Sequence, residues 1–183
     1  MKTVEIKGSA WAVCVGGFKY EAIEDPKKLV RAIANAASPQ LTQLVDAGMV
    51  AGYEHLLMAA VNAARSMETG LSVSKSITVE ALLYASAQDQ ITKALNVMGV
   101  NQKSRGIALM VFATTVNEAK AAYCKAAKLL EEEDDTLLEL DAEKSERLKK
   151  TYGVSDAEIE AIGRPDALER LIVERGALLS LHR

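Results

Sequence analysis

The sequence is poor in the residues that build disulfide frameworks and metal sites. Its 183 residues include two cysteines, Cys14 and Cys124, and two histidines, His55 and His182. These are too few, and too irregularly spaced, for a disulfide scaffold or a zinc site. No apolar run approaches membrane-spanning length, and residues 1–10 lack the apolar core of a signal peptide. We therefore expect a protein of the reducing cytoplasm that contacts no membrane and carries no metal or other cofactor.

An excess of positive charge is also absent. Lysine and arginine total 22 against 25 aspartate and glutamate residues, which gives a formal net charge of −3 and a pI near 5.5. An acidic chain does not attract nucleic acid over its whole surface. Any contact with RNA must therefore be local, or shared with a partner protein.

Apolar residues, by contrast, are plentiful and regularly spaced. They make up 49% of the chain, which is enough to bury a core in one domain. Alternation predicts a strand over 3–7, and short apolar runs predict strands over 10–15 and near Leu44-Val45. The continuous run GIALMVFA, 106–113, predicts a central strand covered on both faces. The first two strands are expected to form a hairpin.

Helical periodicity accounts for most of the remainder. The predicted helices run from Pro26 to just before Pro39, over 54–68, over 78–85, over 117–130 with Asn117 as cap, over 142–151, over 157–162, and from Pro165 onward. The acidic run 131–135 is interpreted as a solvated loop. The expected fold class is α/β or α+β. We expect a single domain, 1–183, with a small, mostly antiparallel or mixed sheet flanked by helices in 1–130 and a helical C-terminal module in 136–183.

The stretch 82–100, LLYASAQDQITKALNVMGV, predicts two short helices with a joint between them. Ser86 and Asp89 fit the capping-box pattern, which would start a new helix in mid-run and turn it away from the first. The second helix would end at a left-handed Gly99 and carry an apolar stripe of Ile91, Ala94, Leu95 and Met98.

Two neighbouring features suggest a binding surface. The helix over 54–68 has a polar stripe opposite its apolar one, formed by His55, Met58, Asn62 and Arg65. The segment Ser74-Lys75-Ser76 precedes the next helix, where an ammonium, hydroxyls and backbone amides can together hold a phosphate. The alternative is an ordinary helix cap with an incidental lysine. If the intervening loop folds back, Arg65 and Lys75 form a small basic patch.

No pattern of residues assembles a catalytic site. Gly16-Gly17 lacks the spacing of a phosphate-binding loop and is interpreted as an ordinary turn. Cys14 and Cys124 have no identifiable base and are interpreted as small buried hydrophobes. For His55, a structural or surface histidine is favoured over a general base. The sequence therefore predicts a binding protein, not an enzyme.

Three blocks together resemble one known family. They are AGYEHLLMAAVNAARSMETG, SKSITVEALLYASAQDQITKALNVMGV and the closing DDTLLELDAEKSERLKKTYGVSDAEIEAIGRPDALERLIVERGALLSLHR. Their order and spacing, with the apolar strand between the second and third, resemble the Cgi-type accessory subunit of the KEOPS tRNA-modification complex, the archaeal relatives of the human PRPK-binding protein. The resemblance covers about residues 45–183, while the N-terminal hairpin agrees in layout more than in letters.

The resemblance implies a non-catalytic α/β subunit of the machinery that forms threonylcarbamoyladenosine in tRNA. Such a subunit binds the atypical protein kinase of the complex, and through that kinase it contacts the threonylcarbamoyl transferase subunit only indirectly. It also recruits tRNA by the single-stranded 3′ CCA end. A largely apolar helical face would then bind the kinase, and a small basic site would bind the RNA.

One departure from the family pattern affects the predicted RNA site. Archaeal relatives commonly have Ser-Gly-x-Arg-Gln-Ile at the joint, where this chain has SAQDQI over 86–91. Asp89 in place of the arginine removes a phosphate donor and adds repulsion. We expect RNA contacts from Lys75, Arg65 and His55, with Gln90 and Lys93 as weaker candidates. Gln90 can hydrogen-bond an unstacked base or a ribose hydroxyl.

Two other functions are compatible with the sequence. A small-molecule-binding regulatory domain would enclose a metabolite between sheet and helices, with Gly16-Gly17 at the mouth of the pocket. A thiol enzyme would use Cys14 or Cys124 as its nucleophile, and replacing both with serine would then abolish its function.

Overall fold

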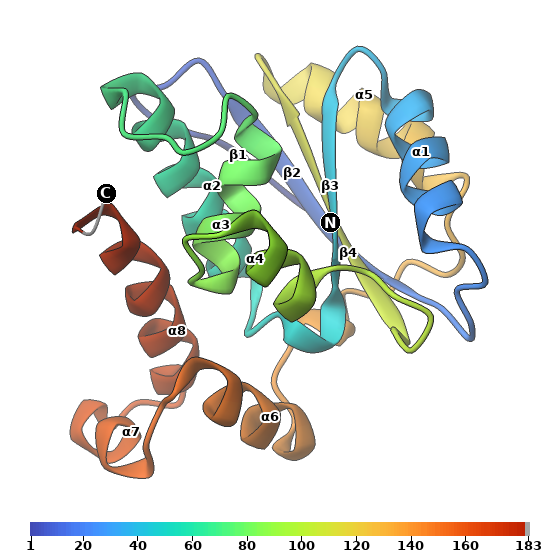
Figure 1. Cartoon of the computed structure of the whole chain (residues 1–183). Coiled ribbons are helices and arrows are strands. Elements are labelled where there is room, and N and C mark those ends of the chain that lie inside the picture. Colours follow the sequence, from blue (N-terminus) through green and yellow to red (C-terminus); the bar gives the residue numbers. More distant parts are fainter. Residues whose placement is uncertain (182–183) are drawn as a thin grey trace.

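A four-stranded antiparallel sheet lies at the centre of the fold, which a computed structural model describes for residues 1–181 (Figure 1). The strand order is β1-β2-β4-β3. The bounds are β1 Lys2–Glu5, β2 Ala12–Lys19, β3 Leu41–Asp46 and β4 Gly106–Ala113. The predicted α/β class, the antiparallel sheet and the N-terminal hairpin are confirmed. His182 lies outside the described residues.

Helices cover both faces of this sheet. In the described chain they are α1 Pro26–Ala37, η1 Ala47–Met49, α2 Tyr53–Thr69, α3 Ile77–Ser86, α4 Ile91–Met98, α5 Val116–Ala127, η2 Asp135–Leu138, α6 Ala142–Tyr152, α7 Asp156–Ile162, α8 Ala167–Ala177 and η3 Leu178–Leu181. Helices α1 and α5 lie on one face, and α2, α3 and α4 lie on the other (Figure 1). None of the described helices has the length and apolar character needed to cross a membrane.

Strand β4 is central and fully buried, as its apolar run predicts. Its even-numbered residues from Ala108 to Phe112 pack into the cluster that includes α2 and α3. Its odd-numbered residues from Ile107 to Ala113 pack into the cluster beneath α1 and α5. The period of two along a strand therefore supplies both apolar layers from one segment.

Helices α6, α7 and α8 form a C-terminal module with a small core of its own. That core includes Leu148, Tyr152, Leu168 and Leu171. Figure 1 shows α8 beside the α2 and α3 layer, with α6 and α7 projecting beyond it. The Asp141 side chain caps α6, and Ser155 and Glu158 form a capping box at the start of α7.

Gly176 brings helix α8 unusually close to helix α3. A Cβ atom added at Gly176 would lie 2.3 Å from the backbone oxygen of Tyr84. Glycine is normally unfavourable inside a helix, because it loses more backbone entropy than other residues when the helix forms. Here it is required because any side chain would push the two helices apart.

The interpretation of Gly16-Gly17 as a turn is wrong. Both glycines lie inside β2 and pair with Leu109 and Ala108 of β4. A Cβ at Gly16 would collide with the Tyr123 hydroxyl group, and one at Gly17 would lie 2.6 Å from the Asp134 backbone oxygen. The glycines let an α5 side chain and the 131–135 segment approach the strand, so they lie beneath packed atoms and not at the mouth of a pocket.

The acidic segment 131–135 is only partly the solvated loop that was predicted. Glu133 forms an isolated β-bridge with Phe18 and accepts a hydrogen bond from the Tyr123 hydroxyl at 2.9 Å. Asp135 accepts one from the Gly17 amide at 2.9 Å. The carboxylates thus fasten this segment to β2 and α5.

Two predicted helix starts are displaced by two residues. Helix α5 is capped by Thr115, in a capping box with Glu118, and not by Asn117. Helix α8 starts at Ala167 after Asp166, two residues later than Pro165.

Candidate interaction surface

The side chains predicted to bind RNA lie on or beside helices α2, α3 and α4. Arg65 is exposed near the C-terminal end of α2, and Lys75 is exposed in the loop between α2 and α3. Gln90 and Lys93 are exposed at the start of α4. Within residues 1–181, none of these three cations forms an ion pair. Their charges are therefore open to a partner.

The loop before α3 already contains an anion of its own. The Ser74 amide donates to a carboxylate oxygen of Glu80 at 2.6 Å, and the Ser76 amide donates to the Ser74 hydroxyl at 3.1 Å. Glu80 is fully buried. Two of the backbone amides predicted to hold a phosphate, those of Ser74 and Ser76, are thus already occupied, which leaves the Lys75 ammonium group as the main donor.

The position predicted for His55, on an exposed polar stripe, is wrong. The ring is 2% exposed. Its Nδ1 accepts from the Ala51 amide at 3.1 Å, and Nε2 lies 2.7 Å from the Ala85 carbonyl oxygen, which fixes the neutral tautomer with the proton on Nε2. Burial lowers the pKa of His55 to about 4. The ring is therefore not available for direct contact with RNA.

His55 instead ties the C-terminal module to the end of α3. The Tyr152 hydroxyl donates to the same Ala85 carbonyl at 2.9 Å, and the two rings stack edge to face with centroids 5.9 Å apart. A Glu169 carboxylate oxygen accepts from the His55 amide at 3.1 Å. Sequence reasoning missed Tyr152 and Glu169, because no local motif marks either residue.

The joint between α3 and α4 exists, but its predicted cap does not. Ser86 is the last residue of α3, and its hydroxyl donates to the Leu83 carbonyl at 3.2 Å. Ala87 takes the left-handed conformation, with φ at 51°, and Gln90 precedes α4 without a side-chain cap. Gly99 is extended and not left-handed. A strained alanine, not a capping box, redirects the chain.

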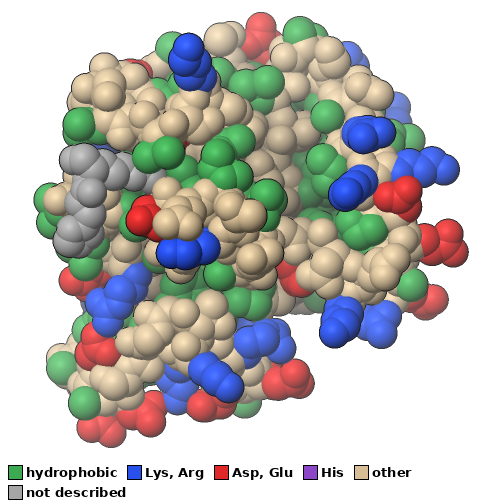
Figure 2. Space-filling view, viewed as in Figure 1, with side chains coloured by type: hydrophobic (Ala, Val, Ile, Leu, Met, Phe, Trp, Pro, Cys, Tyr) green, Lys and Arg blue, Asp and Glu red, His purple; other side chains and the backbone are tan. Residues whose placement is uncertain are grey.

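Helix α4 presents two aliphatic side chains to solvent. Of its predicted apolar stripe, Ala94 and Met98 are buried, whereas Ile91 is 42% and Leu95 is 48% exposed. Ile91 and Leu95 lie one turn apart on one side of the helix. Figure 2 shows hydrophobic side chains around α4 at the centre of this face, while most charged side chains lie toward its margins. We call Ile91 and Leu95 the α4 apolar face.

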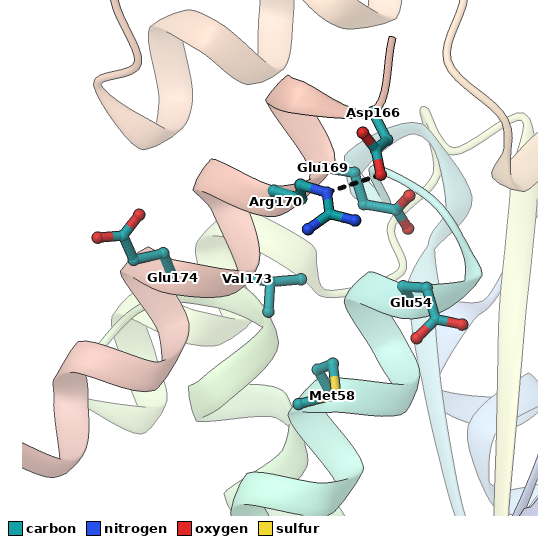
Figure 3. Close-up of a pocket in the computed structure, with 7 residues that line it drawn as sticks. All are labelled: Glu54, Met58, Asp166, Glu169, Arg170, Val173 and Glu174. Atoms are coloured by element: carbon teal, nitrogen blue, oxygen red, sulfur yellow. Dashed lines mark hydrogen bonds and ion pairs between the residues drawn. The ribbon is translucent and has the colours of Figure 1, made fainter. Parts of the chain in front are cut away.

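A groove of about 350 Å³ between α2 and α8 has the opposite character. Figure 3 shows Met58 and Val173 between the two helices, with Arg170 paired to Asp166 at one end. The remaining lining residues are all acidic: Glu54, Glu169 and Glu174. An RNA backbone would be repelled here, so the cationic surface ends before this groove.

The two cysteines differ in burial. Cys14 is buried, as predicted, and burial raises the pKa of its thiol. Cys124 is exposed, so its predicted burial is wrong. Across residues 1–181, no three His, Cys, Asp or Glu side chains are grouped so that they could hold a metal ion.

Exposed aliphatic side chains and unpaired cations on a rigid helical layer fit a protein that acts by binding. Comparison with known families agrees. The family model described as kinase binding protein CGI-121 matches residues 20–180, and the chain belongs to this family of kinase-binding proteins. The Cgi-type resemblance of the sequence is thereby confirmed. A search of curated proteins finds no match.

Proposed function

We propose that this chain is a non-catalytic, cytoplasmic subunit of a KEOPS-type complex and that it binds the atypical kinase of that complex through the α4 apolar face. The observation that carries the proposal is the exposure of Ile91 and Leu95 on a helix whose other side is already packed in the core. A helix that offers two aliphatic anchors one turn apart suits a hydrophobic groove on a partner. Contact with the transferase subunit is then indirect, through the kinase.

Replacing Leu95 with aspartate is expected to weaken binding of the isolated kinase at least about tenfold. Burying a half-exposed leucine supplies on the order of 1.4 kcal/mol, and a carboxylate in its place must be desolvated. Isothermal titration calorimetry without RNA measures the change. Leu129→Asp is the matched control, because Leu129 is 50% exposed and follows α5 on the other side of the sheet. Equal losses in both variants, or none in the first, would contradict the proposed face.

We further propose that the exposed cations on this side of the molecule bind the 3′ CCA end of tRNA. Arg65 and Lys75 are the principal candidates, with Lys93 and Gln90 contributing at the start of α4. Few cations on an acidic protein imply modest affinity that falls steeply with salt. Asp89, next to Gln90, repels phosphate at the start of α4. We therefore expect Arg65 and Lys75, near the end of α2, to contribute more to RNA affinity than Lys93 and Gln90.

The double substitution Arg65→Gln and Lys75→Gln is expected to weaken tRNA binding several-fold and to lower the salt dependence, since each lost phosphate contact removes about one unit of slope. Filter binding with intact tRNA and with tRNA lacking CCA measures both quantities. The double substitution Lys120→Gln and Lys125→Gln, at two exposed positions of α5, is the charge-matched control. Equal binding of the two tRNAs by the unmodified protein would defeat the recruitment proposal.

A further inference from the structure

A polar pocket of about 530 Å³ lies where the C-terminal module meets the end of the sheet. Its walls come from the end of β3 with η1, the start of β4, η2 and the first turns of α6. Four cationic side chains line it: Lys103, Arg105, Lys144 and Arg147. Figure 2 shows Lys or Arg side chains on both sides of the notch between the C-terminal helices and the rest of the molecule.

Lys144 is a buried lysine whose ammonium group contacts no carboxylate. Its side chain is 3% exposed, and Nζ donates to two neutral groups, the carbonyl oxygens of Leu137 at 2.8 Å and Glu139 at 3.1 Å. It forms no ion pair with any residue from 1 to 181. An ammonium group has three donors. Buried charges are normally paired, and here Asp141 and Asp46 act on Lys144 without touching it, so a bound anion would supply the direct partner.

The guanidinium groups of the pocket are also held by neutral acceptors. Arg147 donates through Nη2 to the Gly48 carbonyl at 3.2 Å, and Arg105 donates to the Glu21 carbonyl. Arg147 has an additional exposed pair with Glu143 at 3.3 Å. Lys103 is exposed and forms no ion pair in the described chain. The cations are thus positioned by backbone carbonyls, which leave most of their charge uncancelled.

Two of the three carboxylates in the lining are already occupied. Asp46 accepts from the Gly48 amide at 2.8 Å and from the Ser104 hydroxyl at 2.6 Å. Asp141 accepts from the Lys144 amide at 2.7 Å, as the cap of α6. The third, Glu139, is exposed, and its carboxylate has no side-chain partner among the described residues. Asp46 and Asp141 therefore have structural roles, and the hydrogen-bond donors that remain for a ligand belong to the cationic side chains.

We propose that this pocket binds a small phosphate-bearing ligand, with its phosphate group against Lys144, Arg105 and Arg147. Forked guanidinium donors and an ammonium group suit a phosphate. The volume exceeds that of a phosphate ion and lies in the range of small-molecule sites. Ala47, Met49 and Leu137 supply an apolar wall for an attached organic group. The ligand would join the sheet to α6, at a place distinct from the α4 apolar face.

Calorimetry with inorganic phosphate, AMP and adenosine on the full chain at pH 7 tests the proposal. Phosphate or AMP is expected to bind with a dissociation constant below about 1 mM, and adenosine at least about tenfold more weakly. Tighter binding of AMP than of phosphate assigns the site to an organic phosphate, and equal binding assigns it to the free ion. Failure of both to bind, or equal binding of adenosine and AMP, would overturn the proposal.

Substitutions at exposed residues on the rim of the pocket test binding without disturbing the buried Lys144, so a loss of affinity can be separated from a loss of folding. The exposed pair Lys103→Gln and Arg105→Gln should weaken AMP binding at least about tenfold, because it removes the Arg105 phosphate donor and a second positive charge at the rim. Glu139→Gln should strengthen it two- to threefold, on the order expected for removal of one solvent-screened repulsion. Lys120→Gln, exposed on α5, should change nothing. No loss in the rim variant, or an equal loss in Lys120→Gln, would refute this site.

Proton uptake on binding identifies Lys144 as the innermost contact. Burial lowers the pKa of Lys144 to about 8, with Asp141, Arg147, Asp46, Glu169 and His55 as its charged or titratable neighbours. A bound anion favours the charged form, so AMP should bind more weakly at pH 9 than at pH 7, although its phosphate is largely ionised at both. Lys144→Arg, charged at both pH values, should remove the difference. Equal affinity of the unmodified protein at the two pH values would exclude contact between the phosphate and Lys144.

Discussion

Replacing His55 with alanine is expected to lower the free energy of unfolding by about 3 to 5 kcal/mol. The substitution opens a cavity between α2, α3 and α6. It also leaves the Ala51 amide without an acceptor, and the Ala85 carbonyl keeps only its hydrogen bond from Tyr152 of the two side-chain bonds. Urea denaturation at pH 7.5, followed by circular dichroism, measures the loss. Arg65→Ala, on the exposed side of the same helix, should change stability by less than about 0.5 kcal/mol.

The same residue makes the protein sensitive to acid. The pKa of His55 is about 4 in the folded chain and 6.5 in its ordinary state, because the buried ring near Lys144 resists protonation. The stabilisation is fully present above pH 6.5 and is lost as pH falls through the folded value, a change of about 3 kcal/mol. His55→Gln, which keeps a donor and an acceptor but does not titrate, should show a smaller decline over this interval. An equal decline in both proteins would contradict the assignment to His55.

Replacing Gly176 with valine is expected to destabilise the protein by about 3 kcal/mol, although helix propensity alone favours valine over glycine. The new Cβ would lie 2.3 Å from the Tyr84 backbone oxygen. Backbone at the end of a buried helix has little freedom to yield, so α8 must move away from α3. Thermal and urea unfolding of the variant measure this effect.

Glu174→Val is the matched control for Gly176→Val. Glu174 is exposed in the same helix, where a β-branched residue costs less than about 1 kcal/mol. Destabilisation confined to position 176 is the expected result. Stabilisation of Gly176→Val would show that the two helices do not approach as closely as described here.

The sheet and most helix boundaries were predictable because local chemistry decides them. The length and apolar character of GIALMVFA favour a strand buried on both faces, and helix starts are marked by the backbone or capping preferences of Pro26, Asp141 and Ser155. In these cases the residue and its nearest neighbours contain the physical cause. Packing partners from elsewhere in the chain only reinforce it.

His55 could not be placed from its own helix, because α2 is buried on two sides. The apolar stripe of α2 packs against the sheet. Helix α8, which follows much later in the sequence, covers α2 at His55, on the stripe that was predicted to be exposed. Gly16-Gly17 misled for a related reason. A glycine pair signals either a turn or a close approach, and only the positions of Tyr123 and Asp134 distinguish the two.

The candidate sites divide in the same way. The exposure of Arg65, Lys75 and Lys93 follows from helix periodicity and loop composition. The phosphate pocket could not be predicted in this way. Lys103 and Lys144 belong to separate segments, and only the packing of α6 against the sheet brings them together. A patch along one helix can be read locally, whereas a cavity between elements requires the tertiary fold.

The pairing of β2 with β4 has a consequence for how the protein is made. Ala12 lies opposite Ala113, so the ribosome must release residues up to 113 before the middle of the sheet can close. Until then the N-terminal hairpin is a two-stranded ribbon, which has little stability in water. At a synthesis rate of about 5–20 residues per second, both apolar faces of β2 stay exposed to solvent for seconds. The nascent chain, more than the finished protein, is therefore the form that needs protection from aggregation.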